Sequence, residues 1–128
     1  MFSMCGISKD YKKRSYIAEG IALTTVAKAA STEFYEKEKR FPNNNKEAGL
    51  AEPNTITGQA VSSVAIKSNG RILITYNHKV FDGAELYLVP IMQDKKITWE
   101  CRESDDPIKR IDLKILPHSC RTAIMDKS

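Results

Sequence analysis

The chain has 128 residues, of which 41% are hydrophobic and 28% are charged, and its formal net charge is +4 at pH 7. This length allows one domain with one modest core, and the apolar fraction argues against intrinsic disorder. The mild basic excess favours a solvated surface over nucleic-acid binding, because a dedicated binder would show a denser basic stripe with interleaved aromatic residues. The sequence contains no run of about 20 apolar residues and therefore predicts no membrane span.

The first segment, residues 1–8 (MFSMCGIS), does not have the charged start and apolar middle of a signal peptide. We expect it to be an expression scar or the remnant of a leader, and we exclude it from the predicted fold.

Residues 9–39 have the pattern of one long helix, with no Pro and with Gly20 as the only Gly. One apolar row at helical spacing is predicted to pack on a sheet, and it consists of Tyr16, Gly20, Leu23, Ala27, Ala30 and Phe34. A second row consists of Ile17, Ile21, Thr24 and Tyr35. Because so short a chain has little material to cover both rows, we expect the second row to contact neighbouring subunits. The alternative is that both rows are buried within one domain.

Phe41-Pro42 marks the end of the helix, since the residue before a proline avoids helical backbone. Residues 40–59 are rich in Asn, Gly, Pro and Thr and are predicted to form a long loop between the helix and the sheet, an αβ-loop. The asparagine run in this loop is interpreted only as a turn signal.

Residues 60–101 change to a period of two, which predicts four strands joined by short connections. Asn69-Gly70 is typical of a hairpin turn, and an irregularity is expected near Ser62-Ser63. Pro90 cannot donate to a strand ladder, so it is expected at an edge or at a strand end. Short connections make neighbouring strands antiparallel. The predicted fold class is therefore α+β, with a long N-terminal α-helix packed on a four-stranded antiparallel β-sheet.

Three cysteines are present, and with an odd count at least one cysteine has no disulfide partner within the chain. Cys5 lies in the excluded segment, so a disulfide between Cys101 and Cys120 is the favoured interpretation, and it implies an oxidising compartment. A zinc site is disfavoured because only His78 and His118 could join the cysteines, without the usual close ligand spacing. The sequence predicts no metal and no cofactor.

The segment between Cys101 and Cys120 is charged and irregular, and a bridge around it should stabilise the domain by roughly 3 kcal/mol. Its apolar residues are expected to reach the sheet; they are Ile108, Ile111, Leu113, Ile115 and Leu116.

An enzyme would have to use groups such as His78, Asp82, Glu85 or the pair Asp105-Asp106. Each is better interpreted as turn or surface chemistry, because the sequence has no phosphate loop and no nucleophile elbow. We therefore predict no catalytic residue.

Two parts of the sequence resemble type IVa pilins. The run DYKKRSYIAEGIALTTVAKAASTEFYEKEKRFP resembles the exposed half of the long pilin helix. The segments ITWEC and LPHSCR resemble the W-x-C strand and LP-x-x-C closure that bound the pilin D-region, here residues 101–120. This resemblance extends over residues 9–121 and implies the pilin fold.

The resemblance implies a structural subunit of type IV pili, which serve adhesion, twitching motility and DNA uptake. The implied partners are other pilin subunits, the inner-membrane assembly machinery and a host receptor. The implied locations are the inner membrane and the oxidising periplasm before assembly, and then the extracellular pilus. Ile17, Ile21 and Thr24 would meet neighbouring subunits, while residues 43–58 and the D-region would form the variable surface.

The sequence departs from this family at its beginning. The apolar half of the family's helix, with its membrane span and methylation site, has no counterpart here, so we expect a soluble truncation. Such a truncation would be monomeric and unable to form a native filament. The origin of residues 122–128, native or vector-derived, is left open.

Two related functions remain as alternatives. A minor pilin with an adhesive or DNA-binding role would use the basic groups Lys12-Lys13-Arg14, Lys95-Lys96 and Lys109-Arg110. A type II secretion pseudopilin would share the helix but commonly lacks this disulfide closure.

Overall fold

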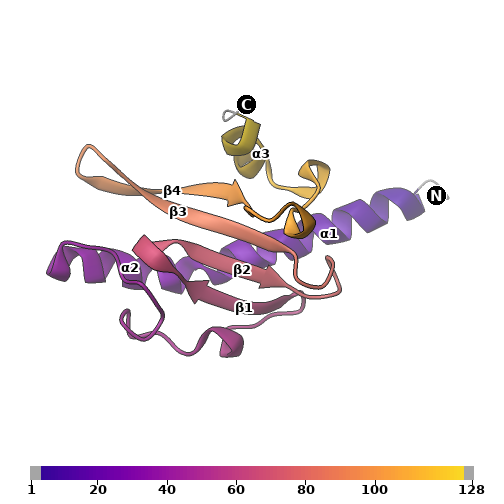
Figure 1. Ribbon diagram of the computed structural model, residues 1–128. Coiled ribbons are helices and arrows are strands. Elements are labelled where there is room, and N and C mark those ends of the chain that lie inside the picture. Colours follow the sequence, from indigo (N-terminus) through magenta and orange to yellow (C-terminus); the bar gives the residue numbers. More distant parts are fainter. Residues whose placement is uncertain (1–3, 126–128) are drawn as a thin grey trace.

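The computed structural model describes residues 4–125, in which a long N-terminal helix lies across one face of an antiparallel sheet (Figure 1). A C-terminal segment follows the last strand and ends in a short helix. The predicted α+β class, with its single four-stranded sheet, is confirmed.

The long helix is divided into α1 (Met4–Leu23) and α2 (Thr25–Glu38). At the division, the Thr24 amide donates to the Ile21 carbonyl at 3.1 Å, and the Thr24 hydroxyl donates to the same oxygen at 2.6 Å. Hydroxyl groups that bond carbonyls of the preceding turn disturb the regular helical ladder. The helix predicted over 9–39 therefore has an interruption that its apolar pattern did not indicate.

The long helix begins before the predicted residue 9 and ends one residue before the predicted residue 39. It begins at Met4, within the segment that the sequence analysis set aside, and residues 1–3 lie outside the described part of the chain. It ends at Glu38, and Lys39 follows with a positive φ of 61° and donates its amide to the Tyr35 carbonyl.

The sheet has the strand order β1-β2-β3-β4, and each neighbouring pair is antiparallel. The strands are β1 (Val61–Ile66), β2 (Ile72–Tyr76), β3 (Glu85–Gln93) and β4 (Lys96–Glu103).

Two local predictions for β1 and its turn agree with this sheet. The register of β1 on β2 shifts between Val61 and Ser63, where an irregularity was expected. Asn69 and Gly70 in the β1–β2 turn both have positive φ, at 60° and 79°.

Strands β3 and β4 extend beyond β2. Leu88 is the last β3 residue with a partner in β2, whereas the pairing with β4 continues to Gln93 and Lys96. Pro90 lies in this extension, on the part of β3 that has no neighbour on the β2 side. Pro90 is therefore at an edge of the sheet on its β2 side, which agrees with the prediction.

The core lies between the helix and the inner face of the sheet. The buried helical residues step along one face at alternating intervals of three and four; they are Ile17, Gly20, Thr24, Ala27 and Ser31. Gly20 allows the closest approach, because a Cβ at this position would overlap the Tyr76 hydroxyl. That hydroxyl donates to the Ile17 carbonyl at 2.7 Å, so one strand residue is fixed to the helix backbone.

The αβ-loop (residues 40–59) contains one short 3-10 turn, η1 (Pro53–Thr55), which packs on the edge strand β1. The tail after β4 contains the 3-10 turns η3 (Pro107–Lys109) and η4 (Leu113–Ile115) and the helix α3 (His118–Met125).

Three of the five tail residues expected to reach the sheet are buried, namely Ile111, Ile115 and Leu116. Ile108 and Leu113 are exposed instead, so the expectation is wrong for these two.

Candidate functional site

The helical row that was expected to contact neighbouring subunits faces the chain's own sheet. Ile17 and Thr24 are both 0% exposed, and Ile17 belongs to the hydrophobic core. The expectation is therefore wrong for Ile17 and Thr24, because the buried face takes residues from both predicted rows. A glutamate at Ile17 would be buried among apolar side chains, so it should prevent folding instead of selectively blocking assembly.

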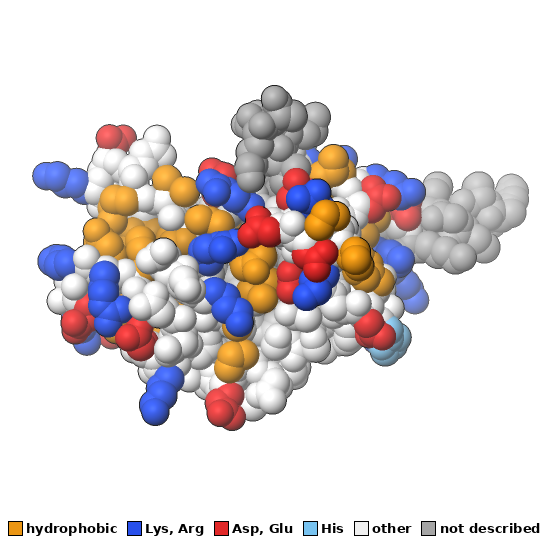
Figure 2. Space-filling model, in the orientation of Figure 1, with side chains coloured by type: hydrophobic (Ala, Val, Ile, Leu, Met, Phe, Trp, Pro, Cys, Tyr) orange, Lys and Arg blue, Asp and Glu red, His pale blue; other side chains and the backbone are white. Residues whose placement is uncertain are grey.

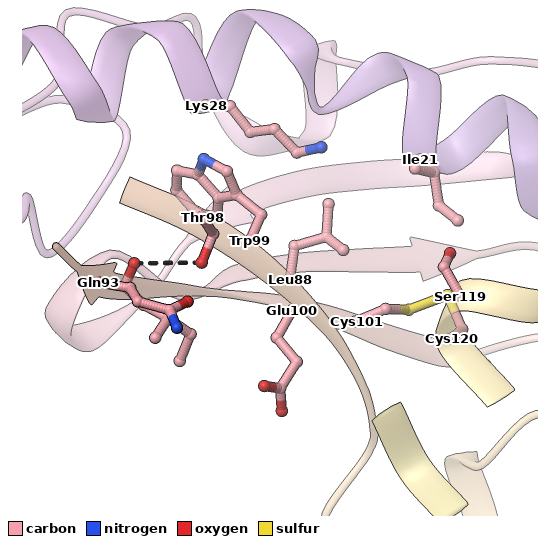
Figure 3. A pocket seen from close by; sticks show the side chains of 11 residues that line it. Ile21, Lys28, Leu88, Gln93, Thr98, Trp99, Glu100, Cys101, Ser119 and Cys120 are labelled. Carbon is pink, nitrogen blue, oxygen red and sulfur yellow. Dashed lines mark hydrogen bonds between the residues drawn. A yellow bond between two sulfur atoms is a disulfide. The ribbon is translucent and has the colours of Figure 1, made fainter. Parts of the chain in front are cut away.

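Ile21, the third expected contact, is half-buried and lines a groove of about 330 Å³ beside the disulfide (Figure 3). Ile21 and Lys28 reach the groove from the helix, and Trp99 reaches it from β4. The bond between Cys101 and Cys120 lies at one end, with the two Cα atoms 4.8 Å apart. The Cys101–Cys120 pair favoured by the sequence is thus present, and it attaches the start of α3 to β4.

The opposite side of the helix carries a surface that the sequence analysis did not single out. We call it the outer helix face; its residues are Ala18, Ala22, Thr25, Val26 and Ala29, and all are exposed. The largest, Val26, is 65% exposed. Between Ala18 and Ala29 no exposed residue is charged, because Glu19 and Lys28 are half-buried. The Glu19 carboxylate is also engaged, since it accepts the Gln59 and Ala60 amides at 3.0 and 2.9 Å.

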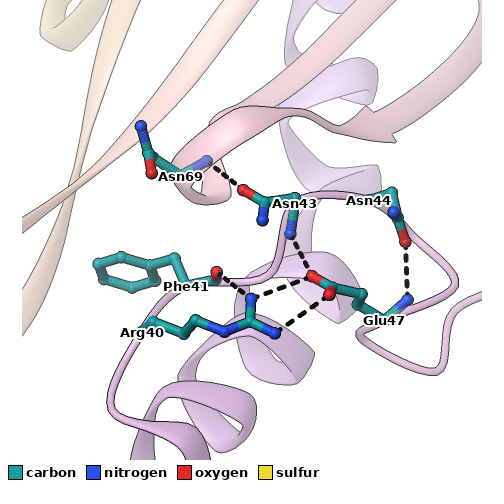
Figure 4. A network of polar contacts seen from close by, with 6 residues as sticks. All are labelled: Arg40, Phe41, Asn43, Asn44, Glu47 and Asn69. Carbon is teal, nitrogen blue, oxygen red and sulfur yellow. Dashed lines mark hydrogen bonds and ion pairs between the residues drawn. The ribbon is translucent and has the colours of Figure 1, made fainter.

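The αβ-loop is ordered by a network of polar contacts (Figure 4). The Arg40 guanidinium donates to both carboxylate oxygens of Glu47, at 3.2 and 3.1 Å. These bonds lower the pKa of the Glu47 carboxyl, and the Asn43 amide, which donates to it at 2.8 Å, acts in the same direction. The side-chain oxygen of Asn43 accepts the backbone N–H of Asn69 at 2.9 Å, which connects the loop to the β1–β2 turn.

Asn45 has a structural role that the asparagine run did not reveal. Its side chain is 4% exposed and donates to the carbonyls of Ala51 and Val64, at 2.9 and 3.1 Å. Its own carbonyl oxygen accepts the Ile66 amide at 2.6 Å. Since β1 is an edge strand, the Asn45 amide takes the place of a neighbouring strand for two backbone groups.

A buried serine organises the first half of the D-region. The Ser104 hydroxyl donates to Glu85 at 2.8 Å and accepts the Asp106 amide at 3.0 Å. The Ser104 carbonyl accepts from Arg110 at 2.8 Å. The loop is therefore held by hydrogen bonds as well as by the disulfide. Nothing in the sequence around Ser104 distinguishes it from an ordinary loop serine, so this role could not be predicted.

A family model of pilins, the subunits of a bacterial filament, matches residues 13–121. The chain belongs to the pilin family. The matched residues include most of the helix, the whole sheet and the disulfide-bounded tail, so the resemblance inferred from the helix end and the W-x-C and LP-x-x-C segments is confirmed.

Curated relatives of this pilin come from two species of Neisseria. It is 32% identical to a fimbrial protein of Neisseria meningitidis serogroup A / serotype 4A (strain DSM 15465 / Z2491), with 90% of this chain and 79% of the relative covered. It is 33% identical to the type IV major pilin protein PilE1 of Neisseria gonorrhoeae, with 88% and 78% covered. The type IV major pilin protein PilE of the same species is 31% identical, with the same coverage. These relatives support a structural pilus subunit, and they do not favour the minor-pilin and pseudopilin alternatives.

The groups considered for catalysis do not converge in this pilin. Glu85 accepts the Ser104 hydroxyl, and Asp105 lies 3.7 Å from Arg71. His78 and Asp82 are exposed in the β2–β3 connection. Within residues 4–125, no three His, Cys, Asp or Glu side chains that the structure describes are grouped to hold a metal ion.

The three basic groups of the sequence lie in separate places. Lys12-Lys13-Arg14 is on α1, whereas Lys95-Lys96 lies in the β3–β4 turn. Lys109 and Arg110 pair with Glu85 and Glu103, at 3.7 and 3.4 Å. They therefore do not form the continuous stripe that a DNA-binding surface would need.

Among the described helices, none has the length and apolar character required to cross a membrane.

Proposed function

We propose that this pilin is a non-catalytic structural subunit of a type IV pilus that packs against other copies through its outer helix face. The observation that supports this proposal is the long uncharged surface from Ala18 to Ala29 in a chain whose other surfaces are rich in charge. Contiguous exposed apolar surface on a soluble domain commonly marks an interaction site.

The composition of the outer helix face suits helix packing. Four of its five residues are Ala or Thr, and only Val26 projects further, so the backbone of a neighbouring helix could approach closely. The charged side chains on either side of this face, Glu19 and Lys28, would border the contact. None of the five residues of this face belongs to the αβ-loop or the D-region, so these two segments could remain accessible in the filament.

The further elements of the proposal follow from the family. Before assembly the subunit would reside in the inner membrane and be added to the filament by assembly machinery. The Cys101–Cys120 bond is compatible with folding in an oxidising compartment. In the filament, the exposed loops would contact host receptors or DNA, and filament dynamics would serve adhesion, twitching motility and DNA uptake.

The test compares two substitutions in bacteria that produce the protein at its natural length. Val26→Glu should leave the fold and the thermal midpoint nearly unchanged, because Val26 is exposed, but it should reduce the yield of sheared surface filaments at least tenfold. Burying one unpaired charge at each subunit contact is costly enough to give such a loss. Lys67→Glu, an exposed residue in the β1–β2 turn, changes the charge twice as much and should leave the yield unchanged.

Two outcomes would contradict the proposal. Absence of this protein from filaments of unsubstituted cells would refute the function itself. A normal filament yield with Val26→Glu would leave the proposed role as a pilus subunit in place, but it would exclude the outer helix face as the contact between subunits.

A further inference from the structure

An exposed apolar side chain protrudes from the D-region. Ile108 is the central residue of η3 and is 84% exposed, which is more than any other large apolar side chain among those the structure describes. Its amide is fixed by the Asp106 carboxylate at 2.9 Å, and the Asp106 amide bonds the buried Ser104 hydroxyl. The position of Ile108 is therefore set by hydrogen bonds that connect it to the core. We call Asp105, Asp106 and Ile108 the knob.

The surroundings of the knob are slightly acidic. The two cations that follow Ile108 in the chain, Lys109 and Arg110, are paired with Glu85 and Glu103. The Asp105 side chain is 92% exposed, although it forms an ion pair with Arg71 at 3.7 Å. The knob and the ion pairs beside it in the chain thus contain four acidic and three basic side chains, and the most exposed carboxylate of the ion pairs, Asp105, belongs to the knob.

A basic groove with apolar walls lies at the other end of the sheet. It has a volume of about 500 Å³ and is formed between the end of α2 and the β3–β4 turn. Tyr35, Met92 and Ile97 supply its apolar side chains, and Met92 is 42% exposed. We call this feature the tip groove. On the face of the molecule that Figure 2 shows, apolar side chains also gather over the β3–β4 end, with Lys and Arg side chains beside them.

The charges at the tip groove are opposite to those of the knob. Lys39, Lys95 and Lys96 line it together with one acid, Glu36. All three lysines are exposed, and none of them forms an ion pair with another residue in the described part of the chain. The groove therefore offers unpaired positive charge around an apolar centre, whereas the knob offers an apolar centre beside exposed negative charge.

The two features are too far apart to meet within one molecule. Lys109 of η3 pairs with Glu85, the first residue of β3, while Met92 lies near the end of this nine-residue strand. Glu85 and Met92 are seven residues apart, so at about 3.3 Å per residue the knob and the tip groove are separated by about 23 Å. A contact between them must therefore join two copies, and because it uses different surfaces on each copy, it can repeat without closing.

We propose that the knob of one subunit inserts into the tip groove of the next, with Ile108 between Tyr35, Met92 and Ile97 and with Asp105 facing the lysines. The inference rests on the proposed function, because it describes a second contact between subunits of the same filament. It is separate from the outer helix face, since neither the knob nor the tip groove includes a residue of that face.

Cysteine cross-linking in assembled filaments tests this contact. The experiment uses cells that produce the protein at its natural length with Cys5→Ser, so that within residues 1–128 the added thiols are the only ones outside the native bond. Filaments with both Met92→Cys and Ile108→Cys should give a ladder of dimers, trimers and longer chains after mild oxidation. Either substitution alone should leave more than nine-tenths of the subunits monomeric. The matched control combines Met92→Cys with Leu113→Cys, an exposed D-region residue outside the knob, and should also give no ladder.

A charge exchange tests the electrostatic part. Lys95→Glu with Lys96→Glu, added to the cross-linking pair, should lower the yield of the ladder about threefold or more, and Asp105→Lys in the same chain should restore much of it. Filaments that form without a ladder, an equal ladder from the Leu113 control, or cross-links to a different protein would overturn the inference while leaving the proposed function intact. If the unsubstituted protein is absent from filaments, the proposed function fails first.

Discussion

Replacing Asn45 with alanine should destabilise this pilin more than replacing either of the two asparagines before it. The Asn45 side chain makes three hydrogen bonds, to the Ala51 carbonyl, the Val64 carbonyl and the Ile66 amide. Val64 and Ile66 are buried residues of β1, whereas Ala51 is exposed and its carbonyl can bond water instead.

The expected magnitude follows from the two groups that lose their partner. A buried backbone donor or acceptor left unsatisfied costs about 1–3 kcal/mol. A hollow beside Asn45 and Ile66 gives water some access once the side chain is removed, so we expect a loss of about 2–4 kcal/mol for Asn45→Ala. This would be a large part of the roughly 5–15 kcal/mol that stabilises a typical domain.

Urea denaturation with the disulfide intact measures this loss. With a slope of about 2 kcal/mol per molar urea, the midpoint should fall by about 1–2 M without a change in slope. Asn44→Ala is the matched control, because Asn44 is exposed and only accepts the Glu47 amide, at 2.8 Å; we expect a loss below about 1 kcal/mol. Equal midpoint shifts for the two variants would refute the role assigned to Asn45 at the sheet edge.

Two further predictions concern the contact between the helix and β2. Gly20→Ala should destabilise the fold by about 1–3 kcal/mol in thermal unfolding, because the added methyl group displaces the Tyr76 ring. Gly→Ala normally stabilises a helix, so a gain in stability here would contradict this contact. Burial, with a smaller effect of Glu19, raises the pKa of Tyr76, so the unfolded chain releases this proton near pH 10 while the folded chain keeps it. The contribution of Tyr76 is therefore complete below about pH 10 and declines above it by up to about 1.4 kcal/mol per pH unit. Tyr76→Phe should show a flatter decline over this range in urea unfolding measured against pH, and identical slopes would refute the assignment.

The elements of this fold could be predicted because their signals are local. A period of two, a positive-φ pair at Asn69-Gly70 and the stop at Phe41-Pro42 depend on neighbouring residues alone, and each corresponds to a feature of the structure. The interruption at Thr24 was missed because a hydroxyl that bonds the preceding turn leaves the apolar period unchanged.

The face of the helix that packs on the sheet could not be predicted in this way. Two rows at helical spacing, one beginning at Tyr16 and the other at Ile17, carry apolar residues, so the period alone does not decide which row faces the sheet. The choice is made by tertiary contacts, above all by the bond from Tyr76 to the Ile17 carbonyl and by the room that Gly20 leaves for the Tyr76 ring. The roles of Asn45 and Ser104 depend in the same way on partners far along the chain.

The face that the helix turns to the sheet also determines which substitutions can impair assembly without impairing folding. Once Ile17 and Thr24 are assigned to the core, a charge at either position is expected to remove the folded subunit, and loss of filaments would then say nothing about contacts. Val26 lies on the side left uncovered, so its substitution affects a surface that the isolated domain does not need. The knob and the tip groove meet the same requirement, because Ile108 and Met92 are exposed in the single chain. Filament contacts in this pilin should therefore be sought at apolar side chains that the domain leaves exposed, and the apolar period of the helix alone cannot identify them.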